Sequence, residues 1–225
     1  MRFIITGPPA SGKGSVAPFI TKEYNILHIS TGQMFREKIK KGTALGLELK
    51  KILDQGHLVS DELTDEMVRQ RLNQDDCKNG FLLDGFPRNI NQAKYLDAYL
   101  EEKGLKLDFA IALVADKDII IKRLIGRRVC QTCGKNYNIY FTQPKKEGVC
   151  DLCNTKLVKR SDDTLEIAEE RLQIYNEETA PILKYYEEKG ILLKVDGNLK
   201  ESYDTFLQIK EKVNAKWLLL SQKEK

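Results

Sequence analysis

The sequence lacks any apolar run that approaches the roughly 20 residues of a membrane-spanning helix. It lacks blocks of like charge, because 37 Lys and Arg are interleaved with 33 Asp and Glu to leave a net charge of only +4. The sequence also lacks a basic stripe with interleaved aromatic residues and an internal repeat. It has no room for a cleavable signal before the first motif. We therefore expect a cytoplasmic protein without nucleic-acid or membrane partners, suited to a small anionic substrate.

Apolar strand-like runs alternate with segments of helical periodicity along most of the chain. The runs at residues 3–5, 80–84 and 107–114 have the length of buried strands, and the periodicity predicts one long helix over residues 164–189. This alternation predicts an α/β fold with a parallel sheet and right-handed crossovers. Residues 126–163 break the pattern, so we expect a second, smaller lobe there.

A glycine-bearing loop follows the first apolar run. Gly7, Gly12 and Lys13 have the spacing of a phosphate-binding P-loop, whose backbone N–H groups face an anion at the start of a helix. The lysine would add a point charge for the outer phosphates. The alternative is a Gly/Pro-rich turn that binds nothing. A lysine directly after the second glycine, behind a hydrophobic strand, favours the phosphate site.

Asp84 ends the apolar run at residues 80–84. Open α/β sheets form their ligand crevice at the carboxyl ends of parallel strands, so a carboxylate there is placed to hold hydrated Mg²⁺. The alternative is an acid that caps the next turn. Arg36 and Arg88, considered alone, would be solvated surface charges, because arginine is usually exposed.

Four of the five cysteines form two pairs. Cys130 and Cys133 make one CxxC, Cys150 and Cys153 make another, and sixteen residues separate the pairs. This spacing predicts a tetrahedral four-cysteine zinc site, which is structural because no coordination position stays open. Iron or cobalt could occupy the same sulfurs. The same spacing would also allow two disulfides or free thiols, although a reducing cytosol disfavours the disulfides.

Three segments together resemble one family. The loop at residues 7–15 resembles that of adenylate kinases and related nucleoside monophosphate kinases, and residues 31–36 and 84–92 resemble their acceptor-binding signatures. The resemblance covers essentially the whole chain in the same order. It implies a long-lid, zinc-bearing adenylate kinase, a monomer that transfers a phosphoryl group reversibly from Mg·ATP to AMP to give two ADP, with lid closure excluding water.

The resemblance also implies the architecture. We expect a P-loop NTPase-type, five-stranded parallel sheet flanked by helices, with an inserted zinc-binding lid and a small helical acceptor-binding segment. The core would comprise residues 1–29, 60–125 and 164–225, the AMP-binding segment residues 30–59, and the lid residues 126–163.

The same resemblance implies the site residues, position by position. Those expected to hold ATP are Ala10, Ser11, Gly12, Lys13, Gly14, Ser15, Arg123, Arg127, Asn136, Tyr137 and Leu199. Those expected to hold AMP are Thr31, Arg36, His57, Leu58, Val59, Gly85, Phe86, Pro87, Arg88, Gln92, Arg160 and Arg171. The catalytic charges would be Lys13, Arg88, Arg123, Arg127, Arg160 and Arg171, with Asp162 and Asp163 orienting the arginines. Asp84 and Ser15 would belong to the Mg²⁺ network, and Cys130, Cys133, Cys150 and Cys153 would hold zinc.

Some positions bear on specificity. Ala10 and Gln33 stand where the family usually has Gly and Asp, which predicts a stiffer loop and weaker metal binding. Gln92 argues for AMP, because an amide can both donate to and accept from the adenine edge, and UMP/CMP kinases do not typically have this glutamine. A kinase for another monophosphate, and a non-enzymatic nucleotide-dependent zinc module that binds a nucleic acid or a protein, are the alternatives.

Overall fold

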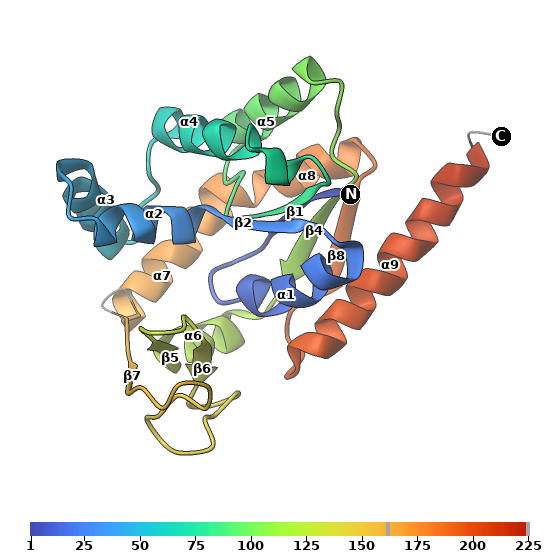
Figure 1. Cartoon of the computed structure of the whole chain (residues 1–225). Coiled ribbons are helices and arrows are strands. Elements are labelled where there is room, and N and C mark those ends of the chain that lie inside the picture. Colours follow the sequence, from blue (N-terminus) through green and yellow to red (C-terminus); the bar gives the residue numbers. More distant parts are fainter. Residues whose placement is uncertain (161–162, 224–225) are drawn as a thin grey trace.

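A five-stranded parallel sheet forms the centre of the computed structural model, which describes residues 1–160 and 163–223. Its strands lie in the order β2-β3-β1-β4-β8, and every neighbouring pair is parallel (Figure 1). Their bounds are β1 Arg2–Thr6, β2 Leu27–Ser30, β3 Phe81–Asp84, β4 Phe109–Val114 and β8 Leu192–Asp196. The predicted α/β fold and strand number are confirmed.

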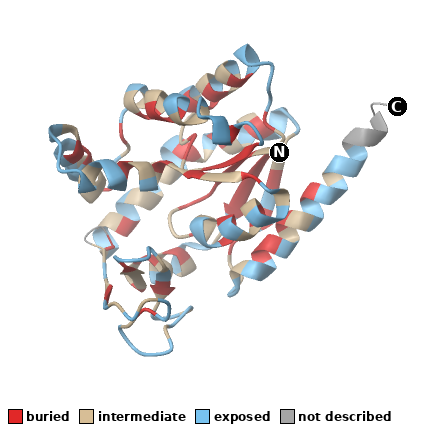
Figure 2. Ribbon diagram, in the orientation of Figure 1, coloured by how far each residue is buried: buried red, intermediate tan, exposed pale blue. Residues whose placement is uncertain are grey.

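Helices bury both faces of this sheet, and the strands are the most continuously buried part of the chain (Figure 2). Successive side chains of a strand point to opposite faces. Phe3 and Ile5 accordingly pack with helices α1 (Lys13–Tyr24) and α9 (Ser202–Lys223), whereas Ile4 packs with α5 (Ile90–Glu102) and α8 (Pro181–Glu188). Burial on both sides explains why these strands read as unbroken apolar runs.

The prediction of one helix over residues 164–189 was wrong. Helix α7 (Leu165–Ile174) runs into a π-helical turn, η2 (Tyr175–Thr179), before α8 begins. Pro181 is the physical cause, because it has no N–H to donate and its ring clashes with the carbonyl four residues earlier. The wider turn is closed by the N–H of Ala180, which donates to the Tyr175 carbonyl at 2.7 Å.

Three helices form a small unit beside the edge strand β2. They are α2 (Thr31–Lys40), α3 (Ala44–Asp54) and α4 (Asp61–Leu72). Phe35, Leu49, Val59 and Met67 make a separate hydrophobic cluster between them. A short 3₁₀ turn, η1 (Asp75–Cys77), then leads into β3.

The segment that interrupts the βα alternation forms a second sheet. After α6 (Lys117–Ile125), strands β5 (Arg127–Cys130), β6 (Asn136–Asn138) and β7 (Leu157–Val158) pair antiparallel in the order β6-β5-β7. Figure 1 shows this sheet below the end of α6, with a long loop hanging beyond it. Within the ranges described, no helix is both long and apolar enough to cross a membrane.

Candidate active site and cysteine cluster

The loop between β1 and α1 adopts a conformation that needs left-handed backbone at several positions. Gly7 and Gly12 have φ of 143° and 102°, and Ala10 has φ of 55°. A Cβ on Gly7 would lie 2.5 Å from the Leu113 carbonyl oxygen, so only glycine fits there. Ala10 is an L-residue in a left-handed conformation that costs roughly 1–2 kcal/mol, and the stiffer loop expected from it stays a prediction.

Lys13 is folded into the loop at the first residue of α1. Its Nζ donates to the carbonyl oxygens of Gly7 and Pro8 at 2.7 and 2.8 Å. Burial lowers the pKa of Lys13 to about 8; Asp84 opposes this shift, and Arg88 and Arg127 add to it. The loop thus holds its ammonium group against two backbone carbonyl oxygens and the Ser11 hydroxyl.

Asp84 lies at the carboxyl end of β3, beside the start of α1. Burial by itself would raise the pKa of its carboxyl group, but the favourable contacts with His28, Lys13 and Arg88 outweigh that and hold the pKa below its usual value. His28 Nε2 lies 3.4 Å from Asp84 Oδ2. The parallel register pairs His28 with Leu82 and Ser30 with Asp84, so alternation puts His28 and Asp84 on the same face of the sheet. Sequence reasoning missed this histidine, because its contact with Asp84 depends on the register between β2 and β3.

Three arginines gather on the acceptor side of Asp84. Burial lowers the pKa of Arg88, and repulsion from Arg171 and Arg36 acts in the same direction against the attraction of Asp84. Arg88 Nε donates to the Gly85 carbonyl at 2.9 Å, and the Thr31 hydroxyl donates to the same oxygen at 2.9 Å. The arginines come from α2, α7 and the segment after β3, and the fold brings Arg36 and Arg171 near Arg88.

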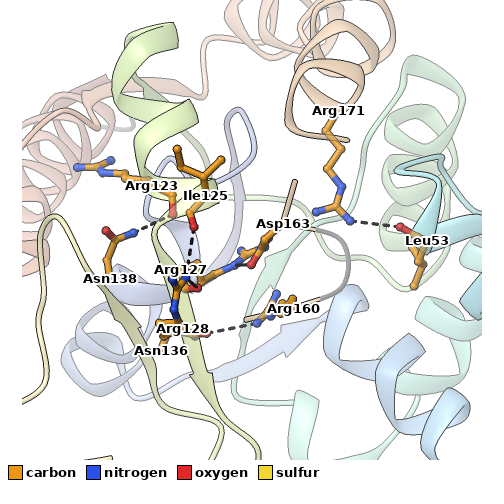
Figure 3. Close-up of polar contacts among 10 residues, drawn as sticks. All are labelled: Leu53, Arg123, Ile125, Arg127, Arg128, Asn136, Asn138, Arg160, Asp163 and Arg171. Atoms are coloured by element: carbon orange, nitrogen blue, oxygen red, sulfur yellow. Dashed lines mark hydrogen bonds and ion pairs between the residues drawn. The ribbon is translucent and has the colours of Figure 1, made fainter. Parts of the chain in front are cut away.

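Protein acceptors hold two arginines of the lid, Arg127 and Arg160, and also Arg171 of α7 (Figure 3). Arg127 makes a two-pronged ion pair with Asp163, which is fully buried, with Nε donating to Oδ2 at 2.8 Å. Arg160 Nη2 donates to Asn136 Oδ1 at 3.3 Å, and Arg171 Nη2 donates to the Leu53 carbonyl at 3.3 Å. Asp162, the other predicted orienting acid, lies outside the described residues.

Arg123 links α6 to the loop after β8. It donates to the carbonyl oxygens of Gly197 and Leu199 at 2.5 and 2.8 Å, and its guanidinium group lies 5.4 Å from the centre of the Phe141 ring. The predicted ATP residues Arg123 and Leu199 are therefore in direct contact with each other. The Tyr137 side chain is buried beside Cys150, and its hydroxyl accepts from the Asp151 N–H at 2.8 Å.

The remaining predicted acceptor residues line the edge of the three-helix unit. Leu58 and Val59 connect α3 to α4, and the His57 side chain is exposed with Nε2 3.8 Å from Glu170 Oε1. Gln92 is 2% exposed and makes two hydrogen bonds within the protein, to Arg88 N and Asp61 Oδ1, both at 2.8 Å. Gln33 Nε2 donates to Glu37 Oε1 at 3.0 Å.

The four paired cysteines converge at one point of the small sheet. Their Sγ atoms all lie within 4.8 Å of one another, and none forms a disulfide. Each CxxC is folded in the same way: the N–H of the residue after it, Gly134 or Asn154, donates to the first cysteine's carbonyl at 2.9 Å. Both of those residues have positive φ, 75° and 56°. Four sulfurs around one tetrahedral zinc ion at about 2.3 Å would lie about 3.8 Å apart, so the donor set fits zinc.

The comparisons with known proteins agree on one family. A model of the adenylate kinase family matches residues 5–191. The chain is 49% identical to an adenylate kinase of Clostridium tetani, over 96% of this chain and 99% of that protein. It is 48% identical to one of Clostridioides difficile, over 88% and 92%, and 47% identical to one of Caldanaerobacter subterraneus, over 94% and 95%.

Proposed function

The chain belongs to the adenylate kinase family, and on that basis we propose how its residues carry out the reaction. It is a nucleoside monophosphate kinase that reversibly converts one ATP and one AMP into two molecules of ADP. Separate groups of side chains hold each nucleotide, act on the transferring phosphoryl group and bind the metals.

ATP binds with its phosphates in the loop at residues 7–15. The loop N–H groups and the positive end of α1 face the phosphates, and Lys13 exchanges the Gly7 and Pro8 carbonyls for phosphate oxygens. Arg123, which already contacts Leu199, ties the loop that borders the adenine to the start of the lid. The predicted ATP residues are Ala10, Ser11, Gly12, Lys13, Gly14, Ser15, Arg123, Arg127, Asn136, Tyr137 and Leu199, with Tyr137 acting through its backbone.

AMP binds between α2 and the segment that follows β3. Arg171 and Arg36 both repel Arg88 in the free protein, and a phosphate dianion bound beside Arg88 relieves that repulsion. Thr31 and Gly85 fix the backbone beneath it. Gln92 recognises the adenine edge, and His57, Leu58, Val59, Phe86, Pro87 and Arg160 complete the acceptor site.

The chemical step needs little proton transfer, because the attacking group is already a phosphate oxygen. The arginines and Lys13 align the two nucleotides and neutralise the charge on the transferring group. Mg²⁺, when bound with ATP, neutralises the phosphate oxygens, and Asp84 and Ser15 would hold it through its water shell. Asp163 fixes Arg127 in the orientation that the phosphoryl group requires.

The cysteine cluster keeps the lid rigid. Zn²⁺ would be held by Cys130, Cys133, Cys150 and Cys153, where it supplies the core that so small a sheet lacks. We assign residues 126–163 to this lid, residues 30–59 to the AMP-binding segment, and the rest to the core. Closure of both over a monomer excludes water, which is the competing acceptor.

The observation that carries this assignment is the electrostatic cluster formed by Lys13, Asp84, Arg88 and Arg127 at the carboxyl edge of the sheet. An acceptor panel tests it. ADP formation from Mg·ATP is measured with AMP, GMP, CMP and UMP, on protein of known zinc content. Turnover restricted to AMP supports the assignment of Gln92, whereas faster turnover with another monophosphate contradicts it.

A further inference from the structure

Gln92 is held by protein groups on both atoms of its amide. The Arg88 N–H donates to Gln92 Oε1 at 2.8 Å, and Gln92 Nε2 donates to Asp61 Oδ1 at 2.8 Å. A backbone N–H can only donate and an ionised carboxylate can only accept. The oxygen of the amide must therefore face Arg88, and the nitrogen must face Asp61.

These two contacts use half of what the amide can do. A primary amide has two lone pairs on its oxygen and two hydrogens on its nitrogen. One lone pair and one hydrogen are occupied, so one acceptor position and one donor position stay available on a side chain that is 2% exposed. The available acceptor and the available donor therefore have fixed positions, because the amide cannot rotate by 180° without losing both contacts.

These fixed positions distinguish one purine from another. The Watson–Crick edge of adenine offers a donor, the 6-amino group, next to an acceptor, N1. Hypoxanthine and guanine offer the reverse, an acceptor at O6 next to a donor at N1. An amide free to rotate by 180° would match either edge, whereas an amide held in one orientation matches only one of them.

Asp61 holds a second amide as well. Asn89 Nδ2 donates to the same Asp61 Oδ1 at 2.9 Å, and Asn89 Oδ1 accepts from the Gln92 N–H at 2.9 Å, as the N-cap of α5. Asp61 itself is the first residue of α4, after the N-cap Ser60. The carboxylate of Asp61 thus joins the starts of α4 and α5 and orients the side chain of Gln92 in the first turn of α5.

We propose that Asp61 is a positioning residue that determines purine specificity, by locking the Gln92 amide in the orientation that accepts adenine and rejects 6-oxopurines. The inference rests on the proposed role of Gln92 in the acceptor site. Asp61 does not touch the nucleotide; it acts through Gln92.

The test compares AMP with inosine monophosphate, which carries the 6-oxo group without the 2-amino group of guanine. Asp61→Asn keeps the size of the side chain but adds a donor, so a turned-over Gln92 amide would lose only its contact with the Arg88 N–H instead of both contacts. We expect the KM for AMP to rise and the AMP-to-inosine-monophosphate ratio of kcat/KM to fall at least tenfold. The KM for ATP and the midpoint of thermal unfolding should stay close to those of the parent. AMP binding measured by calorimetry without ATP should weaken in parallel.

Glu62→Gln is the matched control, because it removes a carboxylate from the next residue of the same helix, and Glu62 is exposed. This variant should keep the parent ratio. Asp61→Leu, which offers no hydrogen bond, provides a second variant and should also lose discrimination.

Two results separate the possible failures. In the first, Asp61→Asn and Asp61→Leu keep the parent ratio of kcat/KM for AMP to that for inosine monophosphate, and Gln92→Leu loses affinity for AMP. This result overturns the role of Asp61 but leaves that of Gln92. A Gln92→Leu variant with parent affinity for AMP shows instead that Gln92 does not recognise the base, and the proposed acceptor site itself is then wrong.

Discussion

At the scale of single residues, the site is a concentration of positive charge that the fold holds together before any nucleotide arrives. Arg88 is strongly affected by this positive charge. Burial, Arg171 and Arg36 all lower its pKa, whereas Asp84 raises it. Such a group costs stability in the free protein and is retained for the anion that it binds. Its removal therefore affects catalysis far more than folding.

Arg88→Ala should lower kcat by about 10²-fold or more, because a donor aimed at developing charge in a closed site contributes on that order. Arg88→Lys should recover only part of the rate, since an ammonium group lacks the planar fork of arginine. Steady-state kinetics and circular dichroism check both variants. Arg69→Ala removes an exposed arginine paired with Glu66 and serves as the control. Near-normal turnover in Arg88→Ala would contradict the assignment.

Lys13 makes nucleotide binding dependent on pH. Its pKa is lowered from 10.5 to about 8 in the free protein, mainly by burial, and phosphate oxygens raise it again. Mg·ATP should therefore bind with net proton uptake at pH 8.5 and with none at pH 6.5, where Lys13 is already charged. Calorimetry at each pH, in two buffers of different ionisation enthalpy, measures the uptake. In Lys13→Arg, which stays charged, the uptake should vanish; uptake that persists there sinks the explanation.

The sequence allowed the charged residues of the site to be predicted but not the way they are held. Lys13 and Asp84 follow from motif and strand position, and Arg88 follows from the resemblance of residues 84–92 to the family's acceptor-binding signature. Asp61 could be seen only as the start of a helix, because its link to Gln92 spans 31 residues and depends on how α4 meets α5. His28 was likewise hidden, because its contact with Asp84 joins two strands through a register that the sequence does not state.

At the scale of elements, the lid depends on its cysteines. Its buried hydrophobic cluster consists of two of them, Cys130 and Cys150, with Tyr137 and Leu157. So small a core cannot order the sheet by itself, and the metal supplies what the apolar area does not.

We expect one zinc ion per chain when the metal content of the protein is measured by mass spectrometry. Cys153→Ser should lose most of that zinc and lower the midpoint of thermal unfolding by about 5 °C or more. Cys77→Ser changes the fifth cysteine, which lies outside the cluster, and should keep the metal. Full zinc content in Cys153→Ser would show that the four sulfurs do not act together.

Helices α2 and α3 approach each other closely at one glycine. A Cβ on Gly46 would lie 2.6 Å from the Lys38 carbonyl and 3.1 Å from the Ile39 Cα. Gly46→Ala should therefore separate the helices, destabilise the protein by about 1–3 kcal/mol and raise the KM for AMP more than the KM for ATP. Chemical denaturation and kinetics test this, with Leu47→Ala, an exposed change on the same helix, as control. Parent-like stability would contradict the close packing.

Elements were easier to predict than their interruptions. The alternating strands and helices follow from apolar periodicity, but the helix expected over residues 164–189 is divided by the π-turn before Pro181. The segments on either side of the turn each keep helical periodicity, so the sequence reads as one helix. Pro181 was therefore the one local signal of the interruption.

At the scale of the whole molecule, the two proposed nucleotide sites lie on either side of Asp84, and the parts that would close over them differ in kind. One is a helical unit with its own hydrophobic cluster, and the other is a small sheet stabilised by sulfur ligands. This arrangement accounts for transfer between two phosphates only if closure of both parts keeps water away from the γ-phosphoryl group.

The most direct test of that claim is the fate of the γ-phosphoryl group of Mg·ATP, with AMP and without it. With AMP, we predict two ADP for each AMP consumed and no accumulation of inorganic phosphate. Without AMP, the rate of ATP hydrolysis should be lower than the rate of transfer by about 10³-fold or more, because the two mobile parts close fully only around both nucleotides. Comparable rates of hydrolysis and transfer would contradict the account, since water would then reach the phosphoryl group as readily as AMP does.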